Sequence, residues 1–345
     1  MSTSNEVSTS KRGAVTNAAR TRRGLVIGAG AALGGAWALG ALTALADVQG
    51  YDPAEADVVV GTSAGSVLAA MIGSHVPLSD LVARLSGYGD ELGGTAPVNA
   101  LDVERDLVYA ALGDIPRPHL LPANAVLAAR TLARPHAHTL MTLAAALAPR
   151  GRGDLTPVRA LVDSLADGWP TRPTTWIVAM DANSGRRVVF GRDDAPAASL
   201  ADAVAASCSA PGYFPPFAIA NRRYVDGGAV SMTNADVLEV AGLDEVLVLA
   251  PMCMRERDRA SSVLARFERR LRNYANRRLE AETRRLSAQG IHVRVLAPGA
   301  SDLTAIGANV MDPRRRDQVF ETAVATTRTL LDHDRWTPES APKSA

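Results

Sequence analysis

The sequence predicts an α/β fold in three layers, with a central, mostly parallel sheet flanked by helices and one helical insertion. Apolar segments of strand length alternate with helical segments in the first part of the chain, as in a βαβ unit. The turns between them are rich in glycine. The composition is that of a globular protein, with 47% hydrophobic and 21% charged residues over 345 positions. A net charge of +1 argues against a surface built to bind nucleic acid, so no nucleic-acid partner is expected.

The N-terminal part of the chain repeats strand, glycine-rich turn and helix twice. Residues 1–23, rich in Ser, Thr and Asn, are expected to be a disordered tail. The expected strand, turn and helix lie at 25–28, 28–35 and 36–48 in the first round, and at 57–60, 61–65 and 66–74 in the second. A parallel pair of strands with a right-handed crossover follows from this order.

The middle of the chain differs, because residues 78–166 contain no strand-like run and are rich in Leu and Ala. We interpret them as a helical insertion or cap. Strands are expected again at 175–179 and 187–190, joined by a hairpin turn at 183–185, and then at 245–249 and 292–296. One domain over residues 24–325 and a C-terminal tail at 326–345 fit this pattern better than two domains.

Gly61-Thr62-Ser63-Ala64-Gly65 is a G-x-S-x-G motif between an expected strand and an expected helix. This context is typical of a nucleophile elbow, in which glycines two residues away on either side give the cramped turn its space. The turn holds the Ser63 hydroxyl at a helix N-terminus, whose dipole favours developing negative charge. Ser63 is therefore a candidate nucleophile.

A serine hydroxyl needs a base to remove its proton. None of the six histidines lies in a glycine-rich loop of the kind that presents a base. Asp226 does, because Gly227 and Gly228 follow it directly and permit a tight turn. Taken alone, this motif would be a plain turn.

Together the motifs resemble the patatin-like phospholipases, in which a glycine-rich loop, a G-x-S-x-G serine and a D-G-[GA] aspartate occur in this order. The family pattern extends to Ser209-Ala210-Pro211, Phe214 and Pro216 before the aspartate and, with looser spacing, to Asn234 after it. The resemblance covers about residues 24–250. It implies a patatin-type fold, a Ser63–Asp226 dyad without histidine, and hydrolysis of acyl esters of lipids, as by a phospholipase A or lysophospholipase. It also implies that the chemistry needs neither a metal nor a cofactor.

The same resemblance gives the glycine-rich loop a role, since family members use its backbone N–H groups as an oxyanion hole. The residues expected to supply these groups are Gly30, Ala31, Ala32, Leu33 and Gly34. The sequence departs from the family pattern where Ala29 and Ala31 interrupt the glycines, and where Leu33 replaces a basic residue. Alanine still offers an N–H group, whereas the loss of the basic side chain changes the electrostatics of the loop.

Residues 24–46 contain no charge and follow a basic segment, so a membrane span or a secretory signal is an alternative interpretation. Six glycines disfavour a continuous helix there. Cleavage after Ala46 would also remove the first strand and the expected oxyanion loop. We therefore interpret the segment as strand, loop and core helix.

Residues 255–289 are expected to form a long helix, with eleven arginines against five acidic residues between Arg255 and Arg285. An apolar stripe is expected at Leu264, Phe267, Leu271 and Tyr274. The helix is either a solvated crossover or a surface that contacts anionic lipid headgroups. The two cysteines, Cys208 and Cys253, suggest a reducing compartment, and we expect a cytoplasmic protein with peripheral membrane contact.

Three alternative functions stay open at this point. A Ser-Asp-His triad would use Ser63, Asp226 and His292 in the chain order of the α/β-hydrolases. A Rossmann-like nucleotide-binding module would use Gly28, Gly30 and Gly34, although their spacing is G-x-G-x-x-x-G. The third is a membrane-associated scaffold that keeps the fold without catalysis.

Overall fold

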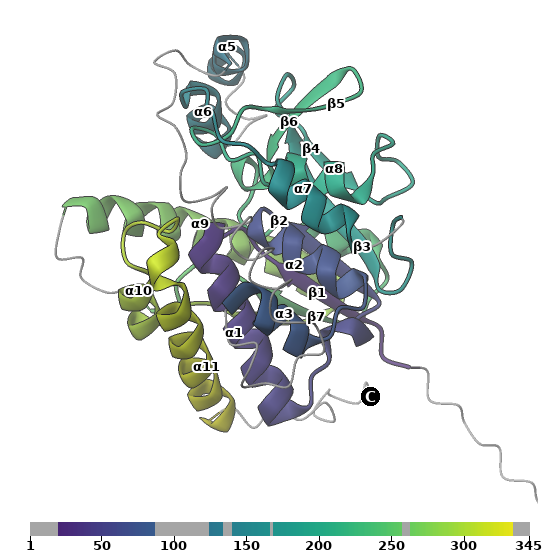
Figure 1. Ribbon diagram of the computed structural model, residues 1–345, viewed down its shortest axis with the longest axis vertical. Coiled ribbons are helices and arrows are strands. Elements are labelled where there is room, and N and C mark those ends of the chain that lie inside the picture. The colour runs from purple at the N-terminus through teal and green to yellow at the C-terminus, as the bar shows by residue number, and fades with distance from the viewer. Residues whose placement is uncertain (1–19, 87–123, 134–139, 166–167, 257–262, 334–345) are drawn as a thin grey trace, which may run out of the picture.

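The computed structural model describes residues 20–86, 124–133, 140–165, 168–256 and 263–333. Within them, eight strands form one sheet in the order β5-β6-β3-β2-β1-β7-β8, with β4 paired to β3 (Figure 1). The parallel strands are β1 (Arg23–Ile27), β2 (Val58–Thr62), β3 (Thr174–Asp181), β7 (Glu245–Leu249) and β8 (His292–Leu296). The antiparallel strands are β4 (Arg187–Phe190), β5 (Phe217–Ile219) and β6 (Arg222–Asp226).

Helices cover both faces of the sheet, which gives the three layers that the sequence predicts. Their bounds are α1 (Ala31–Gln49), α2 (Ala64–Gly73), α3 (Leu78–Ser86), α5 (Ala125–Ala133), α6 (Leu140–Leu147), α7 (Thr156–Asp163), α8 (Leu200–Ser207), α9 (Val263–Ala288), α10 (Ala300–Ile306) and α11 (Arg316–His333). Short 3₁₀ turns include η2 (Gly227–Ala229) and η3 (Ala235–Val240). The described parts of the expected insertion at 78–166 contain the helices α3, α5, α6 and α7.

Alternation along the strands divides the core into two parts. In β1, Leu25 and Ile27 belong to a buried cluster shared with α1, α2, α8 and α11, whereas Val26 belongs to a second cluster shared with α9 and η3. Successive side chains of a strand point to opposite faces, so each strand supplies both clusters. All of these strand residues are apolar, as expected for a sheet covered on both sides.

The register of β3 brings two strand ends together. Val178 of β3 lies opposite Thr62, the last residue of β2, and Ala179 lies opposite Asp226, the last residue of β6. Strand β4 pairs with the same part of β3 and occupies its other edge. Strands β2 and β6 therefore meet end to end along one edge of β3, and the chain leaves both strands at the same place.

The apolar segment that allowed a membrane span forms β1, a short turn and α1. Helix α1 is the one described helix that is long and apolar enough to cross a membrane, and 67% of its most apolar window is buried inside the fold. A Cβ atom on Gly40 would lie 2.6 Å from the carbonyl oxygen of Phe320, which shows how closely α1 packs on α11. This is the packing of a core helix.

Several expected boundaries were wrong. Helix α1 begins at Ala31 and not at residue 36, because the glycines there pack within the helix. The expected tails were too long, since Arg23 opens β1 and Leu331 of α11 is buried. The hairpin of β5 and β6 was not expected, because the prolines before it obscured the strand pattern. Residues 1–19 and 334–345, assigned to the tails, lie outside the described residues.

The buried face of the Arg-dense helix differs from the predicted stripe in the residues whose side chains the structure describes. The buried positions of α9 are Arg272, Ala275, Leu279, Glu282 and Leu286, whereas Leu271 and Tyr274 are half-buried. The side chains of Leu264 and Phe267 lie outside the described residues. Two charged residues therefore replace apolar ones on the face that packs against the sheet.

Candidate active site

Ser63 lies in the sharp turn between β2 and α2. Its backbone has φ 56° and ψ −128°, a conformation that a residue with a side chain adopts only under strain. Glycine is required on both sides of Ser63, because a side chain there would have no room. A Cβ atom on Gly65 would lie 2.1 Å from the Ile27 carbonyl oxygen, and one on Gly61 would lie 2.5 Å from the Cα atom of Ser66. The turn therefore has the geometry that the G-x-S-x-G motif predicts.

Asp226 ends β6 and faces Ser63. The Ser63 side chain lies beside the Asp226 carboxyl group, and the Gly228 N–H donates a hydrogen bond to Asp226 Oδ1 at 2.7 Å. Burial raises the pKa of Asp226 from 3.8 to about 6, against the opposing effects of the Ser63 side chain and the Gly228 N–H. At neutral pH the carboxyl group is largely ionised, yet a better proton acceptor than an ordinary aspartate.

The C-terminal end of α8 holds both residues. The Ser63 N–H donates to Ser207 Oγ at 2.9 Å, and that hydroxyl donates to the Val178 carbonyl at 2.7 Å. The Asp226 N–H donates to the carbonyl of Ser209 at 3.1 Å. Three consecutive residues, 207–209, therefore bridge the two strand ends that meet on β3.

Cys208 is the middle residue of these three. Burial raises the pKa of its thiol to about 12, so the thiol is protonated at neutral pH. It donates to the Ser63 carbonyl oxygen at 3.4 Å. The Ser66 hydroxyl donates to the same oxygen at 2.6 Å. The strained turn at Ser63 is thus held through both its N–H and its carbonyl.

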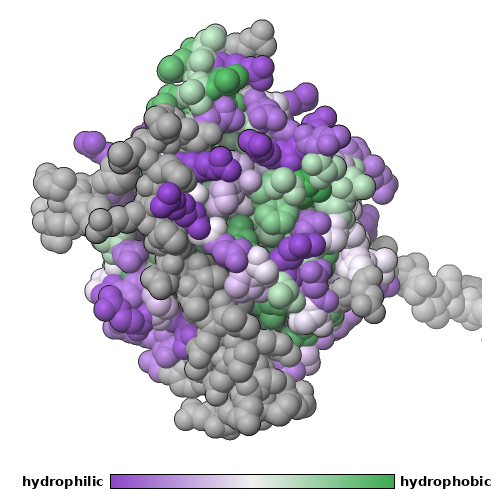
Figure 2. Space-filling model, turned by 45° about the horizontal axis from the view of Figure 1, so that its top comes forward, coloured by the Kyte–Doolittle hydropathy of each residue, from purple (hydrophilic) through white to green (hydrophobic). Residues whose placement is uncertain are grey.

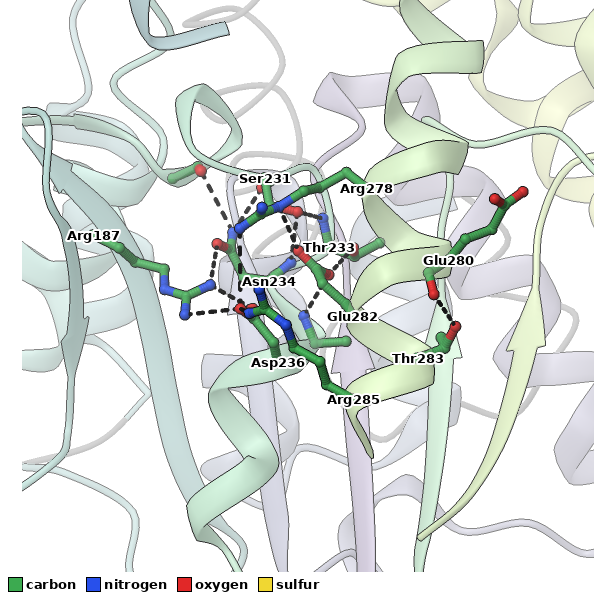
Figure 3. A network of polar contacts seen from close by, with 12 residues as sticks. Arg187, Ser231, Thr233, Asn234, Asp236, Arg278, Glu280, Glu282, Thr283 and Arg285 are labelled. Carbon is green, nitrogen blue, oxygen red and sulfur yellow. Dashed lines mark hydrogen bonds and ion pairs between the residues drawn. The ribbon is translucent and has the colours of Figure 1, made fainter. Parts of the chain in front are cut away.

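Asn234 ties the two loops together from the side of α9 (Figure 3). Its buried amide donates to Thr62 Oγ1 at 3.2 Å and to the Gly227 carbonyl at 3.4 Å. These are the residues next to Ser63 and Asp226. The amide also donates to the Ser231 carbonyl at 2.7 Å, so Asn234 spans the base of the site.

The charged residues of α9 belong to this same support. Asp236 is buried and forms ion pairs with Arg187 of β4 and with Arg285 of α9, as Figure 3 shows. Glu282 accepts hydrogen bonds from Thr233 Oγ1 at 2.6 Å and the Ala235 N–H at 2.9 Å. Burial, with Asp236 nearby, raises the pKa of Glu282. Part of the positive charge of α9 therefore holds the loop between Asp226 and η3.

Ser63 and Asp226 open into a cavity of about 290 Å³. Its walls are almost entirely apolar, and four of the chain's eight methionines contribute to them from separate segments. The main apolar residues lining the cavity are Met141, Ala144, Ala145, Ala148, Pro211, Tyr213, Met232, Met252, Val310 and Met311. Methionine side chains adapt to irregular apolar ligands. The cavity can hold an acyl chain beside the serine.

The glycine-rich loop lines the cavity with Ala29, Gly30 and Ala31. Among the described residues, the N–H groups of Gly30, Ala31 and Ala32 have no hydrogen-bond acceptor, so they are available to an oxyanion. Ala31 has φ 53°, so the loop is strained where alanine interrupts the glycines.

Leu33 and Gly34 correct the expected extent of the oxyanion loop. The Leu33 N–H donates to the Val310 carbonyl at 3.1 Å, and the Gly34 N–H donates to the Gly30 carbonyl at 2.8 Å. The Leu33 side chain lies in the core. A Cβ atom on Gly34 would lie 3.0 Å from Pro251, so this glycine serves packing.

Neither of the two alternative sites fits this geometry. His292 opens β8 opposite Glu245, at the end of the parallel strands away from Ser63. Six residues along β2 and into the turn separate the two levels, which amounts to about 20 Å. No histidine lines the cavity among the described residues. Of the glycines of the supposed nucleotide loop, Gly28 faces two backbone carbonyl oxygens, whereas Gly30 and Gly34 face Pro251. Gly30 also lines the apolar cavity, whose described lining includes no cation for a phosphate.

Sequence reasoning missed the support around the site. Ser207 and Cys208 come directly before the segment that carried the resemblance, but their hydrogen bonds depend on how α8 meets β2. The methionines are far apart in the sequence, and no local pattern joins them. Tyr213 lines the cavity, and Phe214, which belongs to the family pattern, is buried next to it in the chain.

Comparison with known proteins gives a family. Residues 25–239 match the family described as patatin-like phospholipase, which covers more than half of the chain. No curated protein matches the chain. Among solved structures, VipD from Legionella pneumophila is 17% identical, with a TM-score of 0.45, over 91% of this chain and 67% of VipD. The type III effector protein ExoU is 15% identical, with a TM-score of 0.35, over 91% of this chain and 53% of ExoU.

Proposed function

The chain belongs to the patatin-like phospholipase family, and from this membership we propose that it is a serine acyl-ester hydrolase acting on lipids through Ser63 and Asp226. One observation carries the proposal. The side chain of a strained elbow serine lies beside a buried carboxyl group, and both groups open into an apolar cavity. Family membership supplies the reaction class, and this geometry supports the two residues.

The proposed reaction has two halves. As Ser63 Oγ attacks the ester carbonyl, Asp226 takes its proton, and the N–H groups of Gly30 and Ala31 hold the oxyanion. The tetrahedral intermediate collapses, and the alcohol leaves with the proton from Asp226. Asp226 then removes a proton from water, which attacks the acyl-enzyme, and returns that proton to Ser63 Oγ as the fatty acid leaves. A pKa of about 6 suits Asp226 to both proton transfers.

The apolar cavity supports a lipid acyl chain as the group bound beside Ser63. We therefore propose a phospholipase A or lysophospholipase type of cleavage, which frees a fatty acid from a glycerol ester. Catalysis would need no metal or cofactor, because the proposed base and oxyanion donors come from the chain itself.

Contact with an anionic membrane remains part of the proposal. Arg270, Arg277 and Arg284 of α9 are exposed and seven residues apart, so they share one helix face. They form no ion pair among the described residues. Such a stripe suits the anionic headgroups of the cytoplasmic leaflet. Two free cysteines are consistent with a cytoplasmic location.

Ester hydrolysis with graded acyl chains tests the proposal. Parent protein should release acid from p-nitrophenyl esters and from phosphatidylcholine or lysophosphatidylcholine, whereas Ser63→Ala should not. Ser287→Ala is the matched control, because Ser287 is an exposed serine on α9. Turnover by Ser63→Ala at the parent's rate would overturn the assignment, and the absence of any ester hydrolysis by parent protein would overturn the function.

A further inference from the structure

Helices α5 and α6 carry an unusual group of exposed apolar side chains. Val126 and Leu132 of α5 are 61% and 65% exposed, and Leu147 of α6 is 52% exposed. Tyr213, in the loop below them, is 42% exposed. These are four of the seven large exposed hydrophobic residues in the described part of the chain. Figure 2 shows green at the top of the molecule, where Figure 1 places α5 and α6.

This apolar surface is continuous with the cavity that contains Ser63. Helix α6 lines the cavity with Met141, Ala144 and Ala145, and Ala148 directly after the helix lines it too. Leu147, the last residue of α6, is exposed beside this face. Tyr213 both lines the cavity and reaches the surface. A lipid held against this surface would therefore have an apolar path to the serine.

The opposite faces of α5 and α6 are fixed to the loop of Asp226. Leu127, Ala128 and Ala146 form a buried cluster with Val225 and Ala229, which flank the aspartate. Thr142 Oγ1 donates to the Ala229 carbonyl at 3.1 Å. The two helices are thus packed against the fold through these faces. Their outward apolar residues are not needed to hold them in place.

The polar residues around this surface suit lipid headgroups. In the described residues from 124 to 154, the charged side chains are Arg130, Arg150, Arg152 and Asp154. Three of these four are basic. Apolar side chains with a basic rim are typical of helices that lie in a membrane interface.

We propose that α5 and α6 form a lipid-docking surface, in which Val126, Leu132 and Leu147 enter the acyl region and bring the cavity mouth to the membrane. The proposal rests on the proposed function, since it names the surface through which a lipid reaches the same serine. Its occupant is a bilayer or micelle surface. Burial of apolar side chains in the acyl region drives the contact, so it should persist on vesicles without net charge.

The test compares the double variant Val126→Asp/Leu132→Asp with parent protein on phosphatidylcholine vesicles. Neither residue lines the cavity. We expect co-sedimentation and vesicle hydrolysis to fall by about tenfold or more, while hydrolysis of soluble p-nitrophenyl butyrate stays within about twofold. The control is Val240→Asp, because Val240 is 68% exposed on η3. Its vesicle binding should equal that of the parent.

Three results would overturn the docking surface. They are unchanged vesicle binding by the double variant, an equal loss in Val240→Asp, and a parent dimer in lipid-free solution that the double variant breaks. The last result would assign the surface to a second copy of the chain. The milder variant Leu132→Gln, compared in the same way, serves if the double variant loses soluble-ester turnover through misfolding. Failure of the proposed function is distinct, because parent protein would then hydrolyse neither substrate.

Discussion

Replacing Asp226 with asparagine should abolish turnover and, at neutral pH, stabilise the fold. Asparagine keeps an oxygen that can accept from the Gly228 N–H and the Ser63 hydroxyl, but it cannot ionise. In parent protein the pKa of Asp226 is raised from 3.8 to about 6. Between these values the unfolded state loses its proton while the folded state keeps it, so stability falls as the pH rises.

The magnitude follows from the two pKa values. Each pH unit between them removes about 1.4 kcal/mol, which gives a total of about 3 kcal/mol. Below pH 3.8 the carboxyl group is protonated in both states and contributes nothing, and above about pH 6 the loss is constant. Urea unfolding of parent protein and of Asp226→Asn at several pH values measures this loss of stability. The free energy of unfolding of Asp226→Asn, relative to parent, should rise by about 3 kcal/mol from pH 4 to pH 8.

The comparison across pH removes any constant packing difference between the two side chains. Parallel curves for parent and variant would refute the argument that burial strains the ionised carboxyl group. A variant that keeps near-parent turnover would remove Asp226 as the proposed base. In parent protein, kcat/KM should rise with pH and level off above about pH 6, because the base acts when ionised.

Three further predictions concern residues around the site. Ser207→Ala removes the acceptor of the Ser63 N–H, so kcat should fall about tenfold with KM little changed in steady-state kinetics, and parent kcat would contradict this. Arg272→Met leaves the buried carbonyls of Pro251 and Cys253 without their donor and removes one of the two arginine partners of Glu268, which should cost about 3 kcal/mol in urea unfolding. Exposed Arg277→Met is its control and should change stability by about 0.5 kcal/mol or less. His292→Ala should keep turnover within about twofold, whereas a triad requires its loss.

The sequence was informative where one local pattern determines one local structure. The strands at 245–249 and 292–296 were predicted at their observed bounds, because the first contains a short apolar run and the second alternates polar and apolar residues. The elbow at Ser63 was predictable for a similar reason, since only glycine fits two residues away on either side. The meeting of Ser63 and Asp226 was expected from family resemblance alone. Its physical cause is the register of β3, which no local pattern reveals.

Long-range contacts limited the rest of the prediction. The oxyanion loop was expected to extend to Leu33 and Gly34, but a carbonyl far along the chain, that of Val310, accepts from Leu33. Helix α9 was expected to bury an apolar stripe, yet Arg272 is fully buried because the Pro251 and Cys253 carbonyls and Glu268 surround it. The spacing of apolar residues predicts the buried face of a helix only where that face consists of apolar residues.

Arg272 also connects α9 to the cavity. Its guanidinium donates to the carbonyl of Pro251 at 2.7 Å and of Cys253 at 3.0 Å. Pro251 packs against Gly30 and Gly34 of the glycine-rich loop, and Met252 lines the cavity. The Arg-dense helix therefore supports the loops on both sides of the proposed dyad.

The most direct test of the proposed nucleophile is the site of covalent labelling by a fluorophosphonate, read by mass spectrometry of the intact protein and its peptides. The reagent reacts with an activated serine hydroxyl. We predict one adduct per parent chain, carried by Ser63, and no adduct in Ser63→Ala, while the control Ser287→Ala keeps its label. An adduct on another residue, or persistent labelling of Ser63→Ala, would contradict the account.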